Sequence, residues 1–333
     1  MSTPISAADL VGRSVSVDVP ATTANLGAGF DALALALDLG AVIRVVAVPP
    51  SAEARVHVTV IGEGAGQLPT GKSNRFVVAL MDGLAEAGID GTAVGWRVHM
   101  ENHIPVSRGL GSSASATVAA LVAADALLQG ALGRQRILEL ATRLEGHADN
   151  AAAAIFGGLC VVATMDGQPQ AVRLDPPDGL LGALYIPDKH LSTAAMRSAL
   201  PSTVPFADAV HNVGAAALTV AALSQGRLDL LAAGTVDRLH EPYRSSAYPE
   251  LPELIAAARA AGARGACLSG AGSAVIAFSD DPAAAATIAA AMERRALALG
   301  LTGRAAVQAA RAAGARVMAG PAGGSGRTSR PLA

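Results

Sequence analysis

The chain has 333 residues, with 25 lysines and arginines, 27 aspartates and glutamates, and a formal net charge of −2. This balance of charge, without a block of basic residues, argues against nucleic acid or an anionic membrane as a partner. A hydrophobic content of 51% excludes disorder over the bulk of the chain. Asp125 and Gln129 interrupt the longest apolar stretch before it could span a membrane, and no signal-peptide pattern opens the chain. We therefore expect a cytoplasmic protein.

The first half of the chain is predicted to mix strands and helices. Alternating apolar and polar residues indicate strands, and apolar residues with a helical period indicate helices. The strands are expected at 15–20, 41–48, 55–61, 95–102 and 158–164, and the helices at 74–88, 112–129, 135–145 and 149–156. The runs at 41–48 and 55–61 flank Pro49 and Pro50, which suggests that they pair as antiparallel neighbours.

The second half is predicted to form another α+β lobe. Its strands are expected near 171–174 and 181–186, its helices at 207–223, 228–239, 251–261 and 282–299, with a tight glycine turn between two strands before the last of these helices and a final strand after it. We place the boundary between the lobes near 165–169, which divides the chain into 1–167 and 168–319. Residues 320–333 are glycine-rich and polar, and are expected to form a disordered tail.

One glycine-rich segment, Gly66 to Ser73 (GQLPTGKS), fits the P-loop string GxxxxGK[ST]. A P-loop strand lies inside a parallel sheet and should be apolar throughout, whereas the strand before this segment alternates. We therefore expect a surface loop here, with a P-loop nucleotide site as the alternative.

A second segment, Gly109 to Ala114 (GLGSSA), runs directly into a predicted helix. It fits the dinucleotide string GxGxxA, but no acidic residue follows at the expected distance. A glycine loop at a helix N-terminus can hold an anion on its backbone N–H groups, with help from the helix dipole. Ser112 is then either a ligand for a metal or phosphate oxygen, or simply the N-cap of the helix. A third segment, Leu268 to Ser273 (LSGAGS), is typical of a hairpin turn.

Taken together, these segments resemble the signature motifs of the GHMP small-molecule kinases. The motifs are PATTANLGAGFD at 20–31, IPVSRGLGSSASA at 104–116 and GACLSGAGSAV at 265–275. Within that superfamily, EGHADN at 145–150 and HEPYR at 240–244 are similar to segments of the homoserine kinase family. The resemblance implies an α+β fold of two lobes, the first like ribosomal protein S5 domain 2 and the second ferredoxin-like. It also implies ATP-dependent phosphorylation of the side-chain hydroxyl of L-homoserine in threonine biosynthesis.

The resemblance also implies a set of site residues. The ATP-binding residues would be Asn74, at the adenine, and Pro105, Val106, Ser107, Arg108, Gly109, Leu110, Gly111, Ser112, Ser113, Ala114 and Ser115, around the phosphates. Magnesium would be held by Ser112 and Glu139. The catalytic residues would be Asn25, Asp31 and Asn150, and the substrate-binding residues His147, Asp149, Arg197, Arg244 and Gly270. A homodimer is expected from the same resemblance. The alternatives are another GHMP small-molecule kinase and a P-loop nucleotide hydrolase that uses Gly66 to Ser73.

The chemistry of homoserine is consistent with this set. An arginine binds a carboxylate through two parallel hydrogen bonds, which suits Arg197 and Arg244. Asp31 and Asp149 are candidates for the ammonium and hydroxyl contacts, and the sequence does not apportion them. Asn150 stands where other branches of the superfamily carry an aspartate base. Since asparagine cannot accept a proton, we expect catalysis to depend on alignment and charge neutralisation.

Overall fold

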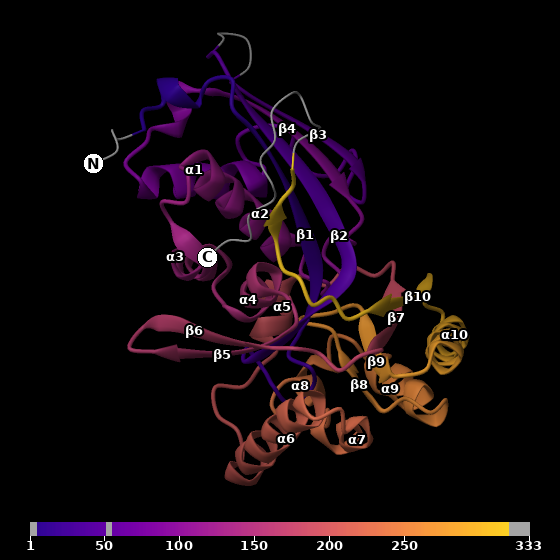
Figure 1. The fold of residues 1–333 in the computed structure, drawn as a ribbon. Coiled ribbons are helices and arrows are strands. Elements are labelled where there is room, and N and C mark those ends of the chain that lie inside the picture. The colour runs from indigo at the N-terminus through magenta and orange to yellow at the C-terminus, as the bar shows by residue number, and fades with distance from the viewer. Residues whose placement is uncertain (1–4, 51–54, 320–333) are drawn as a thin grey trace.

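Two β-sheets organise the chain in the computed structural model, which describes residues 5–50 and 55–319 (Figure 1). In the first sheet, five strands follow the order β11-β1-β2-β4-β3, while β5 pairs with β2 and β6 pairs with β5; in the second, the order is β10-β7-β9-β8. The strands are β1 (Ser14–Ala24), β2 (Leu33–Val48), β3 (Val56–Gly62), β4 (Gly95–Asn102), β5 (Leu159–Met165), β6 (Gln168–Leu174), β7 (Leu181–Pro187), β8 (Gly265–Leu268), β9 (Val275–Ser279), β10 (Gly303–Ala309) and β11 (Arg316–Val317). The helices are α1 (Arg75–Glu86), α2 (Ser112–Leu127), α3 (Gly133–Glu145), α4 (Asp149–Phe156), α5 (Thr193–Ser198), α6 (Phe206–Ser224), α7 (Leu231–Gly234), α8 (Glu241–Arg244), α9 (Leu251–Ala260) and α10 (Pro282–Ala298).

The first sheet differs from the sequence-based prediction in one pairing. The runs at 41–48 and 55–61 were expected to be antiparallel neighbours, and this is wrong, because β4 lies between β2 and β3. β2 pairs with β4 in antiparallel fashion, and β3 pairs with β4 in parallel. The helix α1 connects β3 to β4, and such a crossover returns the chain in the direction that a parallel pair requires.

The core of the first lobe is built around α2, which lies among α1, α3, α4 and the first sheet (Figure 1). Most of its 16 residues are buried, including Val118, Leu121 and Leu127. A helix that is apolar on all sides is expected to be enclosed in this way, and its many alanines allow close neighbours. The buried position of α2 fixes its N-terminus, where the glycine loop meets the helix.

The second lobe has the ferredoxin-like order expected from the sequence. Its strands and helices follow the pattern β-α-β-β-α-β along the chain, from β7 through the β8–β9 hairpin and α10 to β10. Its core gathers Tyr185, Tyr248, Leu254, Ile288 and Met292 between the sheet and the helices α9 and α10. The two-sheet α+β architecture confirms the predicted fold class.

The helix expected at 228–239 is shorter in the structure. A 3-10 turn at Leu228–Leu230 leads into α7, which ends at Gly234. Beyond it, the Asp237 carboxylate accepts hydrogen bonds from the backbone N–H groups of Leu239, His240 and Glu241. A short acidic side chain that binds nearby N–H groups competes with a helix for them, which explains why no helix continues through residues 237–239.

The predicted lobe boundary after residue 167 falls in the turn of the β5–β6 hairpin, where Met165 lies opposite Gln168. Both strands belong to the first sheet, and β11 returns to pair with β1. Strand pairing therefore favours a division after Leu174, with β11 rejoining the first lobe, and the division into domains stays a prediction. The tail expected at 320–333 lies outside the described residues.

Among the described residues, α6 is long and apolar enough to cross a membrane by length and composition, and it is not the stretch that the sequence singled out. Within the fold, hydrogen bonds of a polar side chain hold this helix in place. Asn212 donates hydrogen bonds to Asp237, at 2.7 Å, and to the carbonyl of Ala28 in the first lobe, at 3.1 Å. These bonds attach α6 to both lobes.

Candidate active site

A cavity of about 630 Å³ lies between the lobes. Its walls come from the β1–β2 connection, the loop before α2, the α3–α4 junction, the segment 191–197 and the loop 270–272. The cavity brings together all of the predicted site residues except Pro105, Leu110 and Glu139. Residues up to 245 positions apart in the sequence meet here, as in the hydrogen bond from Asn25 to the carbonyl of Gly270.

The glycine loop before α2 has the backbone geometry of an anion site. Gly111, with φ of 71°, is the N-cap of α2, so the second of the two alternatives for Ser112, the N-cap, is wrong. A Cβ on Gly111 would lie 1.9 Å from Thr22 Oγ1, and one on Gly109 would lie 2.0 Å from the Ser269 carbonyl oxygen, so both positions require glycine. The N–H groups of residues 107–111 donate to no other described residue, which leaves them available to an anion.

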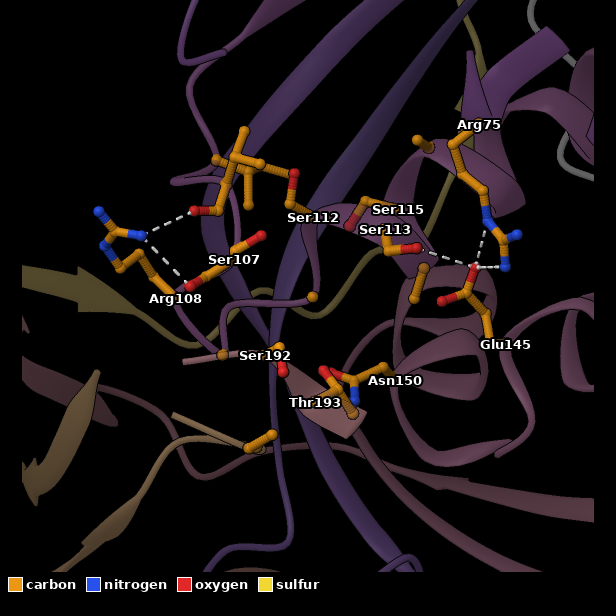
Figure 2. A pocket seen from close by; sticks show the side chains of 18 of the residues that line it. Arg75, Ser107, Arg108, Ser112, Ser113, Ser115, Glu145, Asn150, Ser192 and Thr193 are labelled. Carbon is orange, nitrogen blue, oxygen red and sulfur yellow. Dashed lines mark hydrogen bonds and ion pairs between the residues drawn. The ribbon is translucent and has the colours of Figure 1, made fainter. Parts of the chain in front are cut away.

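The carboxylate that faces this loop belongs to Glu145 (Figure 2). Its Oε1 accepts hydrogen bonds from Ser113 Oγ at 3.1 Å, from Thr117 Oγ1 at 2.6 Å, and from Arg75 Nε and Nη2 at 2.9 and 2.6 Å. Its Oε2 accepts none from the described part of the chain. One oxygen of Glu145 is therefore fixed by the protein, and the other is free to bind a ligand.

Glu139, predicted as a magnesium ligand, is not in the cavity, and that prediction is wrong. Its carboxylate contacts Gln135 and Arg136 on its own helix. Six residues of α-helix turn a side chain by about 240°, so Glu139 and Glu145 face different directions. The sequence did contain the right signal, because Glu145 opens the EGHADN segment and stands immediately before the loop that carries His147.

The setting of Glu145 requires a nearby cation. It is the last residue of α3, where the helix dipole places partial negative charge, and its side chain is only 7% exposed. Arg75, the first residue of α1, supplies the compensating charge, and the sequence analysis missed it. Mg²⁺ takes oxygen ligands, often one or two carboxylates together with phosphate oxygens and water. Glu145 and Ser112 both line the cavity, and Glu145 Oε2 and the Ser112 hydroxyl, neither of which bonds to another described residue, are oxygen donors of the kind that such an ion takes.

Asn74, predicted to contact adenine, lines the cavity but uses its side chain to hold the backbone. Its Oδ1 caps α1 by accepting a hydrogen bond from Phe76 N at 3.0 Å, and its Nδ2 donates to the carbonyl of Pro69 at 2.7 Å. The side chain therefore fixes the loop that borders this end of the cavity, and the adenine contact stays a prediction.

Two arginines of the second lobe also line the cavity, and both guanidinium groups lie over the ring of Phe30. Arg197 forms two hydrogen bonds with the Asp31 carboxylate, at 2.9 and 2.7 Å. Arg244 is 2% exposed and donates through Nη1 to the carbonyl of Gly270 at 3.0 Å. The centre of the Phe30 ring lies 5.6 Å from Arg197 Cζ and 5.3 Å from Arg244 Cζ. Phe30 was not among the predicted residues.

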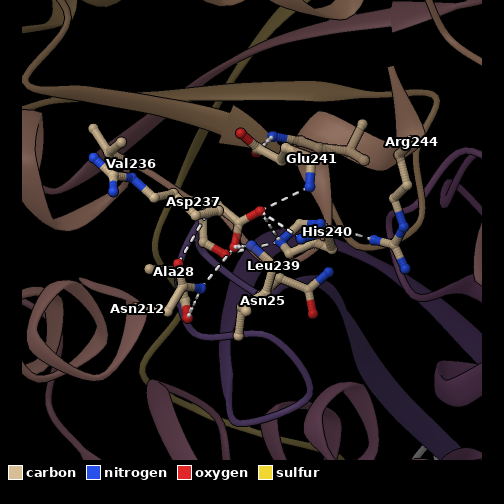
Figure 3. A network of polar contacts seen from close by, with 12 residues as sticks. Asn25, Ala28, Asn212, Val236, Asp237, Leu239, His240, Glu241 and Arg244 are labelled. Carbon is tan, nitrogen blue, oxygen red and sulfur yellow. Dashed lines mark hydrogen bonds and ion pairs between the residues drawn. The ribbon is translucent and has the colours of Figure 1, made fainter. Parts of the chain in front are cut away.

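A buried polar network sets the position of Arg244 (Figure 3). His240 Nε2 donates to the carbonyl of Gly27 at 2.9 Å, and burial lowers the pKa of His240 to about 4. The neutral ring therefore accepts a hydrogen bond at Nδ1 from Arg244 Nη1, at 3.1 Å. Asp237 in turn holds the backbone of His240 through its N–H group. Arg244 Nη2 bonds to no described residue, and its two hydrogens are available to a substrate.

The α3–α4 junction orders three of the predicted residues. His147 Nδ1 donates to Asp149 Oδ1 at 2.6 Å, and this bond raises the pKa of His147. The same oxygen accepts the backbone N–H of Asn150 at 2.6 Å. Asn150 Oδ1 accepts from Thr22 Oγ1 at 2.7 Å, so the amide of Asn150 is held beside the glycine loop.

Asn25, predicted to align the substrate, shapes the β1–β2 connection. Besides its bond to Gly270, its Oδ1 accepts the backbone N–H of Asp31 at 3.1 Å. Asn25 and Asp31 both have positive φ, of 71° and 54°. Residues of this kind adopt that conformation more readily than most, since their short polar side chains bond locally.

Comparisons with known proteins agree with this geometry. The GHMP kinases N terminal domain family matches residues 75–158, and the GHMP kinases C terminal family matches residues 219–298. The chain is 44% identical over 262 residues to the homoserine kinase of Moorella thermoacetica, covering 79% of this chain and 86% of that protein. It is 43% identical over 279 residues to the homoserine kinase of Corynebacterium efficiens, covering 82% and 88%.

Solved structures show the same fold. The crystal structure of homoserine kinase from Cytophaga hutchinsonii superposes with a TM-score of 0.81 at 30% identity, covering 92% of this chain and 97% of that one. L. major mevalonate kinase, at 18% identity and a TM-score of 0.68, shares the fold, covering 94% of this chain and 100% of that one. The glycine loop, the paired arginines and these similarities together show that the chain belongs to the homoserine kinase family of the GHMP kinases.

Proposed function

We propose that the chain transfers the γ-phosphoryl group of ATP to the side-chain hydroxyl of L-homoserine, in threonine biosynthesis. Membership of the GHMP kinase family implies the use of ATP. The observation that carries the proposal is the division of one cavity into two chemically distinct ends. One end offers free backbone N–H groups and Glu145, which suit a metal-bound phosphate; the other offers Arg197 and Arg244 with nearby carboxylates, which suit an amino acid.

At the nucleotide end, the N–H groups of the loop 107–111 would hold the phosphates, and the N-terminus of α2 would add its dipole. Ser112 Oγ and Glu145 Oε2 would hold Mg²⁺. When bound, the ion neutralises charge that develops on the phosphate oxygens. Arg75 and Thr117 keep Glu145 in place through Oε1, which would leave Oε2 free to bind the ion.

At the acceptor end, the homoserine carboxylate would bind the free Nη2 of Arg244 together with Arg197. The ammonium would replace Arg197 as the partner of Asp31, so the zwitterion would insert into the existing ion pair. Asp149, whose Oδ1 is held by His147 and Asn150, lines the same cavity next to Asn150 and would contact the hydroxyl. The sequence did not decide which of Asp31 and Asp149 contacts the ammonium and which the hydroxyl, and the proposal assigns the ammonium to Asp31 and the hydroxyl to Asp149.

Proton transfer needs no strong base at residue 150 under this proposal. The Asn150 oxygen already accepts from Thr22. Phosphoryl transfer passes through a loose transition state, for which alignment and charge neutralisation contribute most. The rigid placement of Asn150, Asp149 and the loop is therefore the expected source of catalysis.

The P-loop alternative has little support from the fold. The strand before Gly66–Ser73 is β3, which lies at the edge of the sheet, whereas a P-loop strand is internal. Lys72 is exposed and does not line the cavity. A homodimer and a cytoplasmic location, both expected from the sequence, stay predictions.

The test is ADP release from MgATP with a panel of acceptors: L-homoserine, D-homoserine, L-serine, mevalonate, shikimate and galactose. We expect strong turnover with L-homoserine alone, because only an amino acid of the right hand and length pairs both charges. Turnover of another acceptor would be consistent with a kinase but would show that its substrate is not L-homoserine. ATP hydrolysis that no acceptor stimulates would support the P-loop alternative at Gly66–Ser73.

A further inference from the structure

The side chain of Arg108 leaves the glycine loop and joins it to the second lobe. Sequence reasoning placed Arg108 among the ATP-binding residues, and its backbone does line the cavity. Its guanidinium, however, points away from Ser113 and Glu145 (Figure 2). It donates through Nε to the carbonyl of Pro187 at 2.6 Å, through Nη2 to that of Asp188 at 2.8 Å, and through Nη1 to His190 Nδ1 at 2.7 Å.

The segment that Arg108 holds leads directly to the acceptor end of the site. Pro187 is the last residue of β7, and the chain continues through residues 188–190 to Ser192, whose Oγ caps α5 by accepting the N–H of Ala195 at 3.1 Å. The helix α5 carries Arg197, which pairs with Asp31. Arg108 is thus connected, over a short stretch of chain, to one of the arginines that would bind the acceptor carboxylate.

Other contacts fix the two ends of this segment. Pro187 pairs with Gly303 in the second sheet, and Asp188 N donates to the carbonyl of Thr302 at 2.9 Å. Within α5, Met196 is the residue whose side chain is buried. Lys189 contributes two anchors, a hydrogen bond to its carbonyl from Ser273 Oγ at 2.6 Å and an ion pair with Glu250 at 3.1 Å. Three of the anchors before α5 therefore come from one guanidinium, and that guanidinium belongs to the phosphate loop. Nη1 of Arg108 also donates to the carbonyls of Val106 and Ser107 in its own loop, at 3.2 and 3.3 Å. The planar arrangement of five donors explains how one side chain serves both the loop and the segment.

We propose that Arg108 is a positioning residue that couples the two ends of the active site. Phosphates bound by the loop fix its backbone, Arg108 then fixes residues 187–190, and Arg197 is held where the acceptor carboxylate binds. Occupancy of the loop by nucleotide therefore increases the affinity for the acceptor, and by linkage the acceptor increases the affinity for nucleotide by the same factor. The inference rests on the proposed function, because it takes homoserine as the acceptor.

The test is the dissociation constant of L-homoserine, measured by titration calorimetry with and without saturating magnesium AMP-PNP. In the wild-type protein we expect the nucleotide to tighten homoserine binding at least about fivefold, the lower end of ordinary coupling. In Arg108→Met, which keeps the aliphatic stem and loses every donor, we expect the two constants to agree within about twofold. The affinity for AMP-PNP alone should change much less, since the backbone N–H groups remain.

Two further variants separate positioning from general damage. His190→Asn keeps an acceptor near the Nδ1 position and should retain the coupling, whereas His190→Leu removes it and should weaken the coupling. Arg227→Met removes an arginine whose ion pair with Asp229 is on the surface, and it should behave as the wild type does. Melting temperatures of all variants identify any that fail to fold.

Several results would overturn the inference: no coupling in the wild-type protein, unchanged coupling in Arg108→Met, or a uniform loss of affinity for both ligands with the coupling retained. Failure of the proposed function is a separate outcome. It would appear as a wild-type protein that neither binds nor phosphorylates L-homoserine.

Discussion

Arg197 and Asp31 bind one another through two parallel hydrogen bonds in the acceptor end of the cavity. Each is about one-third exposed, and Asp149 and His147 line the same space. The pair keeps both charges compensated before a substrate arrives. A zwitterion carries one positive and one negative group. Its carboxylate can pair with Arg197 and its ammonium with Asp31, so neither side chain loses its counter-charge. A ligand with only one charge would break the pair and satisfy only one of its members.

This relationship predicts the effect of Arg197→Lys. The substitution keeps the charge and loses the two-pronged geometry, so we expect the KM for L-homoserine to rise by roughly 10- to 100-fold, as for a lost charge-assisted hydrogen bond of about 1.5–3 kcal/mol. The kcat should fall much less. Steady-state kinetics measure both, with Arg227→Lys as the matched control. An unchanged KM would show that Arg197 does not contact the acceptor.

Glu145, the proposed magnesium ligand, gives a prediction that is paired with one for Glu139. In Glu145→Gln, the amide oxygen can still accept from Arg75 and Thr117, but the charge offered to Mg²⁺ is lost. We expect kcat to fall on the order of 10²- to 10³-fold, the usual effect of removing one preorganised electrostatic contact. Binding of Mn²⁺ in the presence of ADP, followed by electron paramagnetic resonance, should weaken in parallel.

Glu139→Gln is the matched control for that experiment, because Glu139 lies on the same helix outside the cavity. It should leave kcat and Mn²⁺ binding near the wild-type values. A severe loss in Glu139→Gln, with Glu145→Gln unaffected, would reinstate the sequence-based assignment.

Glu241 predicts a pH dependence of stability. Its Oε1 accepts the backbone N–H of Leu268 at 2.7 Å, and desolvation raises the pKa of the carboxyl to about 8. In the unfolded chain the same group has an ordinary pKa near 4.5. The folded state therefore binds the proton more tightly, so this group's contribution to stability is complete below pH 4.5 and is lost as the pH rises through about 8.

Glu241→Gln removes this titration and keeps an oxygen for Leu268. We expect the melting temperature of the variant, relative to wild type, to increase steadily between pH 5 and pH 8. Scanning calorimetry at several pH values measures the difference. A difference that does not vary with pH would mean that the Glu241 carboxyl titrates alike in the folded and unfolded chains.

Lys72→Ala distinguishes the kinase from the P-loop alternative. Because Lys72 is exposed and outside the cavity, the substitution should leave the affinity for AMP-PNP within about twofold of the wild-type value, as is usual for surface changes. Titration calorimetry is sufficient to decide this. Loss of nucleotide binding in this variant would support the alternative.

Local backbone requirements made much of the site predictable from the sequence. Gly109 and Gly111 are glycines because neighbouring atoms leave no room for a Cβ, and such positions are visible as motifs. The two arginines were identified through their motifs in the same way. The sequence did not show which glutamate of α3 faces the glycine loop, because the phase of the helix decides it.

The remaining features depend on contacts between distant parts of the chain. His240 meets the carbonyl of Gly27 across 213 residues, and no local pattern indicates that contact. The alternation that predicted β2 and β3 indicates strands but does not name their partners, so the insertion of β4 was missed. Phe30 likewise gains its role only when both arginines reach it from the second lobe.

The pairing of β11 with β1 has a consequence for how the molecule is made. Val17 lies opposite Val317, so this part of the outer edge of β1 is covered by a strand that leaves the ribosome some 300 residues later. Ala315 and Met318 add backbone bonds to Ala154 and Ser16 at the same place. Until then the edge presents free N–H and C=O groups, which invite association with other chains. The last described strand thus closes the first lobe, and a nascent chain must protect that edge throughout its synthesis.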